Sequence, residues 1–257
     1  GDCVHIKTED NKNYLMDGGG SENYQVGKKT LRPYLLKNGV SHIDGAMVTH
    51  LHTDHYQGII ELCKEGMVDK LIVYEGNQMF EDEILADTGL KREDVIYVGG
   101  GDKLNLGKGA RADILWPEKK SVSEYKRSIT SETDENEISL IIKVTVNDVD
   151  VLVTGDVDAE CEEMMINAKG ESASASVLKV AHHGSRYSWS DSFMDAVKPE
   201  MAVIQVGKNN YGHPTSEVLD GLEARGIPVM RNDLMGAIGL DVRKGQIIGQ
   251  VHMIENR

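Results

Sequence analysis

Cysteines are few in this sequence, and they are not spaced for cross-linking. The 257 residues include three cysteines, Cys3, Cys63 and Cys161, and no Cys-x-x-Cys pair. An odd number of widely separated thiols argues against a disulfide-stabilised scaffold. Cys63 and Cys161 fall within helical patterns of apolar residues, so we expect both to be buried in the core.

Long apolar runs and linkers are also missing. No stretch approaches the roughly 18 apolar residues that a membrane-spanning helix needs, and no signal peptide is visible. The composition, with 40% hydrophobic and 27% charged residues, is that of an ordinary globular chain, and no Pro-, Ser- or Gly-rich segment divides it. We therefore predict a single domain spanning residues 1–257.

Positive charge is scarce. The chain has 28 lysines and arginines against 42 aspartates and glutamates, which gives a formal net charge of −14. Proteins that bind nucleic acid usually present a basic face, because much of their affinity comes from neutralising phosphates. The balance disfavours tight, extended DNA binding by this chain alone, although bound cations and helix amino termini would make the field locally positive.

Metal-ligating side chains, by contrast, are concentrated in residues 49–58 (THLHTDHYQG), which favours metal binding over a histidine-rich surface turn. The four candidate ligands are His50, His52, Asp54 and His55. Positions i and i+2 point about 200° apart on a helix, so this spacing predicts a loop. Apolar residues at 45–49 predict a strand before it, and those at 55–66 predict a helix after it. We expect the ligands at the carboxyl end of a strand, and their nitrogen and oxygen atoms suit zinc, iron or manganese.

Further motifs follow along the chain. They are Gly1-Asp2-Cys3, residues 17–20 (DGGG), 136–140 (NEISL), 154–156 (TGD), 178–185 (LKVAHHGS) and 211–214 (YGHP). With the histidine stretch they resemble the metallo-β-lactamase fold superfamily over nearly the whole chain. Within it they resemble the C-terminal extracellular domain of ComEC-type DNA internalisation competence proteins. One departure is Gln57, where the family usually has glycine.

The resemblance implies an α/β fold (α+β in some schemes), the four-layer αβ/βα sandwich, with ligands from both halves along one edge. The predicted strands and helices alternate in two similar halves, about 1–120 and 121–257, as this fold requires. The opening at Gly1 lies inside what resembles the first strand of the family. We therefore expect a membrane part to lie outside this sequence.

The resemblance also implies ligands for two divalent ions, zinc or manganese. One ion would take His50, His52 and Asp156, and the other Asp54, His55, Asp156 and His182. Most binuclear members add a third histidine to the first ion, but no histidine lies between His55 and His182. Asn136 or water would approach that place. We expect the first ion to bind more weakly, or to be a harder ion such as manganese.

Several roles have two interpretations at this point. Asp17 either supports a ligating histidine by hydrogen bonding or is a plain turn residue, and the glycines at 18–20 would let backbone approach a substrate. Adjacent histidines at a strand end point in different directions. His182 is the predicted ligand and His183 a supporting or substrate-facing group, with the reverse assignment left open.

Substrate contacts are predicted in the stretch after these histidines. Ser185, Arg186 and Ser188 would bind a phosphate, and neighbouring aromatic faces would stack on a base. His213 is predicted as a general acid or a phosphate contact, with a structural role as the alternative. The predicted catalytic residues are Asp54, His183 and His213. The polar segment 121–137, which contains Lys126, Arg127, Ser128, Thr130 and Ser131, is either a substrate-facing loop or a solvated connector.

The predicted activity is hydrolysis by a hydroxide that bridges two metal ions. No Gly-x-Ser-x-Gly elbow competes with it. The leading hypothesis is a nuclease or phosphodiesterase that acts on DNA in a competence (DNA-uptake) context. It would lie at the extracellular face of the cell membrane, with the membrane part of an uptake channel as partner. The alternatives are a stand-alone, cytoplasmic hydrolase of a small ester or phosphodiester, which the acidic charge favours, and a non-catalytic, metal-containing module of an uptake complex.

Overall fold

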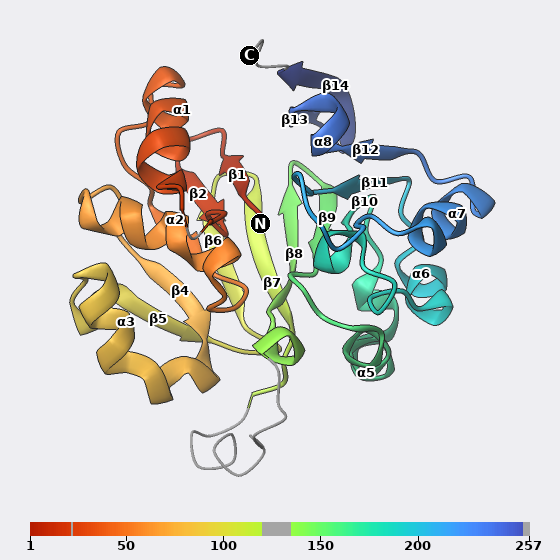
Figure 1. Ribbon diagram of the computed structural model, residues 1–257, viewed down its shortest axis with the longest axis horizontal. Coiled ribbons are helices and arrows are strands. Elements are labelled where there is room, and N and C mark those ends of the chain that lie inside the picture. The colour runs from red at the N-terminus through yellow and green to blue at the C-terminus, as the bar shows by residue number, and fades with distance from the viewer. Residues whose placement is uncertain (22, 120–134, 254–257) are drawn as a thin grey trace. The chain divides into compact units, whose positions relative to one another are not determined.

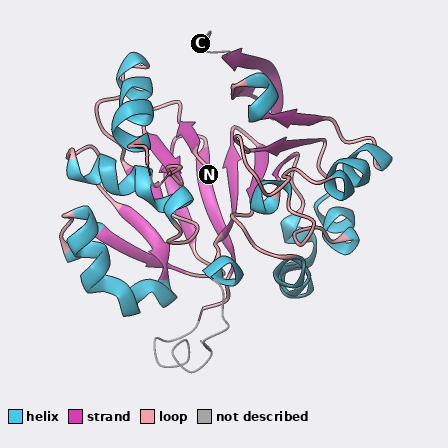
Figure 2. Cartoon of the chain, viewed as in Figure 1, coloured by secondary structure: helices cyan, strands magenta, loops and turns pink. Residues whose placement is uncertain are grey.

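The computed structural model describes residues 1–21, 23–119 and 135–253. The chain divides into two compact units. Unit 1 comprises Gly1–Asp102, Leu106–Lys108 and Trp116–Leu140, and unit 2 comprises Lys103–Asn105, Gly109–Leu115 and Ile141–Arg257. Each unit is a mixed sheet with helices, as the cartoon in Figure 2 shows.

Unit 1 is built on a five-stranded sheet in the order β1-β2-β3-β4-β5 (Figure 1). The strands are β1 (Val4–Lys7), β2 (Asn13–Met16), β3 (Gly45–Met47), β4 (Leu71–Tyr74) and β5 (Val95–Val98). β1 and β2 form an antiparallel hairpin, and the other pairs are parallel. The helices are η1 (Gly27–Leu31), α1 (Arg32–Lys37), α2 (Thr53–Lys64), η2 (Glu75–Phe80), α3 (Glu81–Thr88), η3 (Arg92–Asp94) and η4 (Glu135–Ile138). Parallel strands joined through helices bring successive strand ends to one edge of the sheet.

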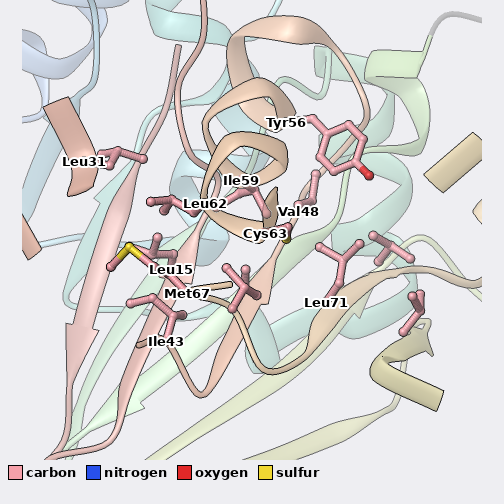
Figure 3. Close-up of a cluster of buried hydrophobic side chains, with 14 of the residues drawn as sticks. Leu15, Leu31, Ile43, Val48, Tyr56, Ile59, Leu62, Cys63, Met67 and Leu71 are labelled. Atoms are coloured by element: carbon pink, nitrogen blue, oxygen red, sulfur yellow. The ribbon is translucent and has the colours of Figure 1, made fainter. Parts of the chain in front are cut away.

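The core of unit 1 fixes helix α2 against the sheet. Ile59 and Leu62 of α2 are fully buried in one cluster with Val48 and Leu71, which lie at the end of β3 and the start of β4 (Figure 3). Burying a leucine or isoleucine contributes about 1.5–3 kcal/mol of stability. The first turn of α2 carries two of the predicted ligands, and the buried residues further along the helix hold it against the sheet.

Unit 2 contains most of a seven-stranded sheet, whose order is β12-β11-β10-β9-β8-β7-β6. The strands are β6 (Lys103–Gly107), β7 (Ala110–Trp116), β8 (Ile141–Val146), β9 (Val149–Val153), β10 (Val177–Lys179), β11 (Met201–Ile204) and β12 (Val229–Arg231). β8 and β9 are antiparallel, whereas β9 to β12 pair in parallel. The helices are α5 (Ala159–Lys169), η5 (Gly170–Ala173), η6 (Ala181–Gly184), α6 (Asp191–Val197), α7 (Ser216–Ala224) and α8 (Asn232–Met235), and a separate hairpin joins β13 (Ala237–Arg243) to β14 (Gln246–Met253).

The α/β class is confirmed, as are the strand predicted at 45–49 and the helix predicted at 55–66. β6 was not expected, because its sequence KLNLG has only two apolar residues in its five. One prediction needs correction. The histidine stretch is a loop only through His52, since helix α2 begins at Thr53 and includes Asp54 and His55. The predicted core positions of Cys63 and Cys161 are confirmed, because both thiols are buried. Most of the polar segment 121–137, including Lys126 to Ser131, lies outside the described residues.

Membrane-spanning helices are absent from the described part of the chain. None of its helices is both long enough and apolar enough to cross a bilayer.

Candidate metal sites

Asp17 is the central acceptor of the histidine stretch in unit 1. It ends strand β2, is buried, and has a left-handed backbone with φ 58°. Its Oδ1 accepts from the Thr49 backbone N–H at 2.8 Å, and its Oδ2 accepts from the Thr49 hydroxyl and from His55 Nδ1, both at 2.8 Å. Burial raises the pKa of Asp17, and the contact with His55 opposes that shift. The interpretation that Asp17 supports a histidine therefore fits its contacts better than a plain turn residue.

These contacts fix which ring nitrogen carries hydrogen in two histidines. His55 Nδ1 must donate, because the carboxylate of Asp17 only accepts. The Thr49 hydroxyl donates its one hydrogen to Asp17, so its oxygen accepts from His50 Nδ1 at 3.1 Å. Both rings are left with Nε2 as a lone-pair donor. This arrangement, with a hydrogen bond to an outer acceptor at Nδ1 and the lone pair at Nε2, is typical of metal-ligating histidines.

The ligand-competent atoms of unit 1 lie close together. His50 Nε2 is 3.1 Å from His52 Nδ1, near the roughly 3.3 Å expected between two nitrogens that each lie about 2.0–2.1 Å from a tetrahedral zinc ion. The rings of His50 and His55 have centroids 4.2 Å apart. Asp54 Oδ2 lies 3.7 Å from His55 Nε2. Imidazole and carboxylate donors in this arrangement fit a divalent ion of the zinc or manganese type.

Helix α2 and the glycines at 18–20 contact each other through backbone atoms. Gly58 N–H donates to the carbonyl of Gly19 at 3.0 Å, and Gly18 N–H donates to the carbonyl of His55 at 2.8 Å. A side-chain Cβ added at Gly18 would lie 2.6 Å from the backbone nitrogen of Ile59. The glycines were expected to admit a substrate. Instead their missing side chains admit helix α2, which ties the ligand-bearing turn to strand β2.

Gln57, the departure from the family pattern, has a structural role within α2. Its amide oxygen accepts from the backbone N–H of Ser21 at 2.7 Å, and its amide nitrogen donates to Glu61 at 2.9 Å. The helix continues regularly through this position. The substitution therefore adds a tether to the loop after Gly20 without disturbing the ligand turn.

Two acidic residues of unit 1 approach the histidines without having been predicted. Asp2 is buried, and its carboxylate lies 3.9 Å from His55 Nδ1. Together with Asp17 and His55 it forms a group of ligand-type atoms within 4.8 Å of one another. Glu135 lies 4.0 Å from His52 Nε2, on the short helix η4 that also carries Asn136. No sequence motif marks Glu135, because only the fold brings its carboxylate close to His52.

Asp156 is the predicted ligand at the end of a strand in unit 2. It follows β9 and Gly155, whose φ is 53°, and its side chain is buried. The buried Lys179 donates from Nζ to the carbonyl of Gly155 at 2.8 Å, and its Nζ lies 3.6 Å from Asp156 Oδ1. Lys179 was not expected here, because lysine is seldom buried without a charged partner. It holds the loop that presents Asp156.

His183 has the contacts of a metal ligand in unit 2. Its Nδ1 donates to the carbonyl of Gln205 at 2.8 Å, which leaves Nε2 as the lone-pair nitrogen, 3.4 Å from Asp156 Oδ2. His182 has its ring beside that of His213, with centroids 5.7 Å apart. The geometry therefore favours the assignment that was left open, with His183 next to Asp156 and His182 next to His213.

Both of these histidines have left-handed backbone conformations. His182 has φ 47° and His183 has φ 55°, a region that costs a non-glycine residue about 1–2 kcal/mol. The non-glycine residues with positive φ in the described chain are Asn11, Asp17, Asn147, Asp148, His182, His183, Lys198 and Lys244. Most lie at turns or at a helix end, and the two histidines lie in η6, where the Ser185 N–H donates to the carbonyl of His182 at 2.9 Å. Asp17 directly follows strand β2. Such strain beside candidate ligands is typical of functional sites.

His213 is held on a loop by Asn209. The Asn209 Oδ1 accepts from the backbone N–H of His213 at 3.1 Å, and its Nδ2 donates to the carbonyl of His213 at 2.9 Å. Burial, together with the neighbouring His182 and His183, lowers the pKa of His213. A neutral imidazole is therefore favoured, which can still donate one N–H to a substrate oxygen.

The three predicted substrate contacts differ in exposure. Ser185 and Ser188 are buried, so neither hydroxyl faces solvent in this conformation. Arg186 is exposed, and its guanidinium lies 3.5 Å from Glu217 at the start of α7. Of the three, Arg186 is the best placed to meet a phosphate. Further along the same stretch, the Ser190 hydroxyl caps helix α6 by accepting from the N–H of Phe193.

Comparison with known proteins places these features in a family. A family model described as the metallo-beta-lactamase superfamily matches residues 1–208. ComE operon protein 3 of Bacillus subtilis (strain 168) is 29% identical over 239 residues, which cover 87% of this chain and 29% of that protein. Competence protein ComA of Neisseria gonorrhoeae is 30% identical over 244 residues, which cover 93% of this chain and 31% of that protein. The chain thus spans less than a third of the length of these relatives.

Solved structures resemble the chain in fold. Zinc-bound PqqB from Methylobacterium extorquens has a TM-score of 0.53 at 12% identity, covering 90% of this chain and 85% of that one. The metallo-beta-lactamase fold protein YhfI from Bacillus subtilis has a TM-score of 0.51 at 14% identity, covering 90% and 88%. At such identities the likeness concerns the fold alone. It confirms the predicted α/β fold.

Proposed function

Because the chain belongs to the metallo-beta-lactamase superfamily and is related to competence proteins, we propose that it is a metal-dependent phosphodiesterase that cleaves DNA. The family and the His/Asp groups support a metal-dependent hydrolase. The choice of DNA as substrate rests on the kinship with competence proteins. The same kinship motivates the proposal that the chain works at the extracellular face of the membrane, beside the membrane part of an uptake channel.

Two sets of residues would hold the metal ions in this proposal. The unit 1 set is His50, His52, Asp54 and His55, and the unit 2 set is Asp156 and His183. The observation that carries the proposal is the hydrogen-bond chain to Asp17, which leaves Nε2 of both His50 and His55 as a lone-pair nitrogen. Histidines in an ordinary surface cluster are not expected to be hydrogen-bonded, directly or through a hydroxyl, to one buried carboxylate.

The side chains of this protein would divide the work of hydrolysis. A bound divalent ion supplies an acidified water near neutral pH and positive charge opposite the phosphodiester oxygens. Asp17 and Gln205 hold the histidine rings in position by accepting from Nδ1. His213 donates its N–H to a phosphate oxygen, and Arg186 adds a planar, charged donor for another oxygen. Asp54, His183 and His213 remain the residues whose loss should reduce turnover most.

Cleavage of defined phosphodiesters tests the proposal. The metal-stripped chain is reloaded with manganese or with zinc and incubated with end-labelled single-stranded DNA, the matching duplex, and bis-p-nitrophenyl phosphate. We expect metal-dependent cleavage that is lost in His55→Ala. His42→Ala is the matched control, because His42 is an exposed histidine whose contact is an ion pair of 4.0 Å with Asp69. It should keep full activity.

Metal counting on the same proteins separates the ligand assignments. We expect two ions in the wild-type chain and fewer in His183→Ala, with His182→Ala unchanged. Loss of metal in His182→Ala alone would instead favour the original assignment of His182. If metal-loaded protein cleaves neither DNA nor bis-p-nitrophenyl phosphate, phosphodiester chemistry fails for this chain. A small-ester hydrolase or a non-catalytic module then takes its place.

A further inference from the structure

Two tyrosines of unit 2 are unusually exposed. Among the large apolar side chains of the described residues, Tyr211 and Tyr187 have the highest exposed fractions, 85% and 74%, followed by Leu234 at 67%. Tyr187 lies two residues after the buried Ser185 in the HHGS stretch, and Tyr211 lies two residues before His213. Aromatic side chains are usually at least partly buried. Their exposure on the two histidine-bearing loops calls for a functional explanation.

The loop that carries Tyr211 is fixed by a single amide. Asn209 Oδ1 accepts from the backbone N–H groups of Tyr211 and His213, both at 3.1 Å. Its Nδ2 donates to the carbonyls of Gly207 at 3.0 Å and His213 at 2.9 Å. The two donors and two acceptor positions of the side chain are all used. The exposed ring of Tyr211 therefore projects from a held backbone.

The loop that carries Tyr187 is held in a similar way and is joined to the first. The backbone N–H of Tyr187 donates to Ser185 Oγ at 3.3 Å, and its carbonyl accepts from Ala159 N–H at 2.9 Å. Between the loops, Thr215 N–H donates to the carbonyl of Gly184 at 2.9 Å. The ring of Tyr211 lies 6.1 Å from that of His213, tilted by 36°. The tyrosines thus belong to the same loop pair as His182, His183 and His213.

The charge of these loops is opposite to that of the whole chain. The chain has 42 acidic residues, but residues 181–190 and 205–216 contain none. They contain Arg186 directly before Tyr187, and Lys208 three residues before Tyr211. A basic side chain and an exposed aromatic ring on the same loop are groups of the kind that bind the phosphate and the unstacked base of single-stranded nucleic acid.

We propose that Tyr211 and Tyr187 stack on unpaired bases of single-stranded DNA, which makes a single strand the preferred substrate. This inference rests on the proposed function and narrows its substrate. In a duplex each base face is covered by its neighbours, so the tyrosines have no face to contact. In a single strand every base offers one, whatever its sequence. Substrate choice then depends on base stacking more than on base identity.

Kinetics of Tyr211 variants test the inference. The metal-loaded chain, Tyr211→Ala, Tyr211→Trp and the control Leu234→Ala are compared on single-stranded DNA, duplex DNA and bis-p-nitrophenyl phosphate, which has no nucleobase. For Tyr211→Ala we expect KM for the single strand to rise on the order of tenfold, the loss of one base–aromatic contact. The constants for bis-p-nitrophenyl phosphate should not change. Tyr211→Trp should restore the KM, and Leu234→Ala should match the wild type.

Two results would overturn the inference. One is an unchanged KM for single-stranded DNA in Tyr211→Ala and in the double variant with Tyr187→Ala. The other is an equal loss on single strand, duplex and bis-p-nitrophenyl phosphate, which would mean that the substitution damages the loop and not a base contact.

Binding keeps the inference testable if the proposed function fails. The metal-loaded chain is titrated into a single-stranded oligonucleotide that carries 2-aminopurine and phosphorothioate linkages. Stacking on tyrosine should quench its fluorescence, and Tyr211→Ala should weaken the quenching, even if no phosphodiester is cleaved. Absence of quenching with the wild-type chain contradicts the inference. Cleavage without quenching would leave the proposed function standing and the base-stacking contact refuted.

Discussion

The two units orient their histidines by different means. In unit 1 the rings of His50 and His55 are set by side-chain hydrogen bonds that converge on the buried carboxylate of Asp17. In unit 2 the backbone itself is left-handed at His182 and His183, and a main-chain carbonyl fixes the His183 ring. Unit 1 should therefore be sensitive to the loss of a charge. Unit 2 should be sensitive to changes in backbone preference.

The largest expected effect is that of Asp17→Ala. The substitution removes the acceptor of three hydrogen bonds in a buried site, among them the one that His55 Nδ1 donates. We expect a loss of about 3–5 kcal/mol in the free energy of unfolding and metal affinity weaker by about 10–100-fold. Urea denaturation and metal titration measure both. Asp44→Ala is the control, since Asp44 also accepts a backbone N–H at 2.8 Å but is not fully buried. Equal losses in the two variants would refute the central role of Asp17.

Lys179→Met tests whether unit 2 also depends on a buried charge. The substitution removes the ammonium group that donates to the carbonyl of Gly155 and lies 3.6 Å from the carboxylate of Asp156. We expect the free energy of unfolding, measured in the presence of a chelator, to be lower than that of the wild type by about 2–3 kcal/mol. Lys143→Met should cost less, because Lys143 donates to a main-chain carbonyl at a more exposed position. A Lys179 variant as stable as wild type would show that backbone contacts alone hold the Asp156 loop.

Glu162 is a buried carboxyl of unit 2 that lacks the donors given to Asp17. It accepts from the backbone of Ser190, but its Oε2 has no hydrogen-bond partner among the residues that the structure describes. Burial, reinforced by Asp158, raises its pKa well above the usual range. The folded state then binds this proton more tightly than the unfolded state, so stability falls as pH rises through the ordinary glutamate range.

Glu162→Gln should remove that dependence. We expect the variant to be more stable than wild type at pH 7 by about 1–3 kcal/mol. The gain should disappear as pH falls below the ordinary pKa of glutamate, where both states of the wild type are protonated. Thermal unfolding between pH 4 and pH 8 measures it. A pH-independent difference, or the same gain in the exposed Glu160→Gln, would show that burial of Glu162 is not the cause.

The smallest expected effect concerns backbone strain. Glycine adopts positive φ without the steric cost, so His182→Gly should stabilise the metal-free chain by up to about 1 kcal/mol. Lys198→Gly, at φ 51° on the residue that follows α6, should do the same and is the control. His183→Gly should gain similar stability but lose metal. If His182→Gly destabilises while Lys198→Gly stabilises, the side chain of His182 makes a contact worth more than the strain.

Local spacing made the candidate ligands of unit 1 stand out in the sequence. His50, His52, Asp54 and His55 fall within six residues, and the strand and helix around them follow from apolar periodicity. The start of helix α2 was placed too late because Thr53 and Asp54 carry no apolar signal. Helix α2 itself is the element that fills the space of the glycines at 18–20, and no local pattern predicts such a contact.

The unit 2 residues depend on contacts between distant segments. Lys179 meets Gly155 across 24 positions, and His183 meets Gln205 across 22. The order of adjacent histidines could not be decided from strand geometry, because both depart from it with positive φ. The burial of Ser185 and Ser188 was likewise invisible in a polar stretch. For unit 2, the sequence therefore indicated which residues belong to the candidate site, but it did not indicate how their side chains are oriented.

The most direct test of the proposed chemistry is a manganese titration of the metal-stripped chain, with the rate of single-stranded DNA cleavage followed at each addition. We expect cleavage to rise from zero and to saturate near two ions per chain, and we expect His55→Ala and His183→Ala both to fail to reach that rate. Cleavage that does not respond to metal, or that survives unchanged in His55→Ala, would contradict it.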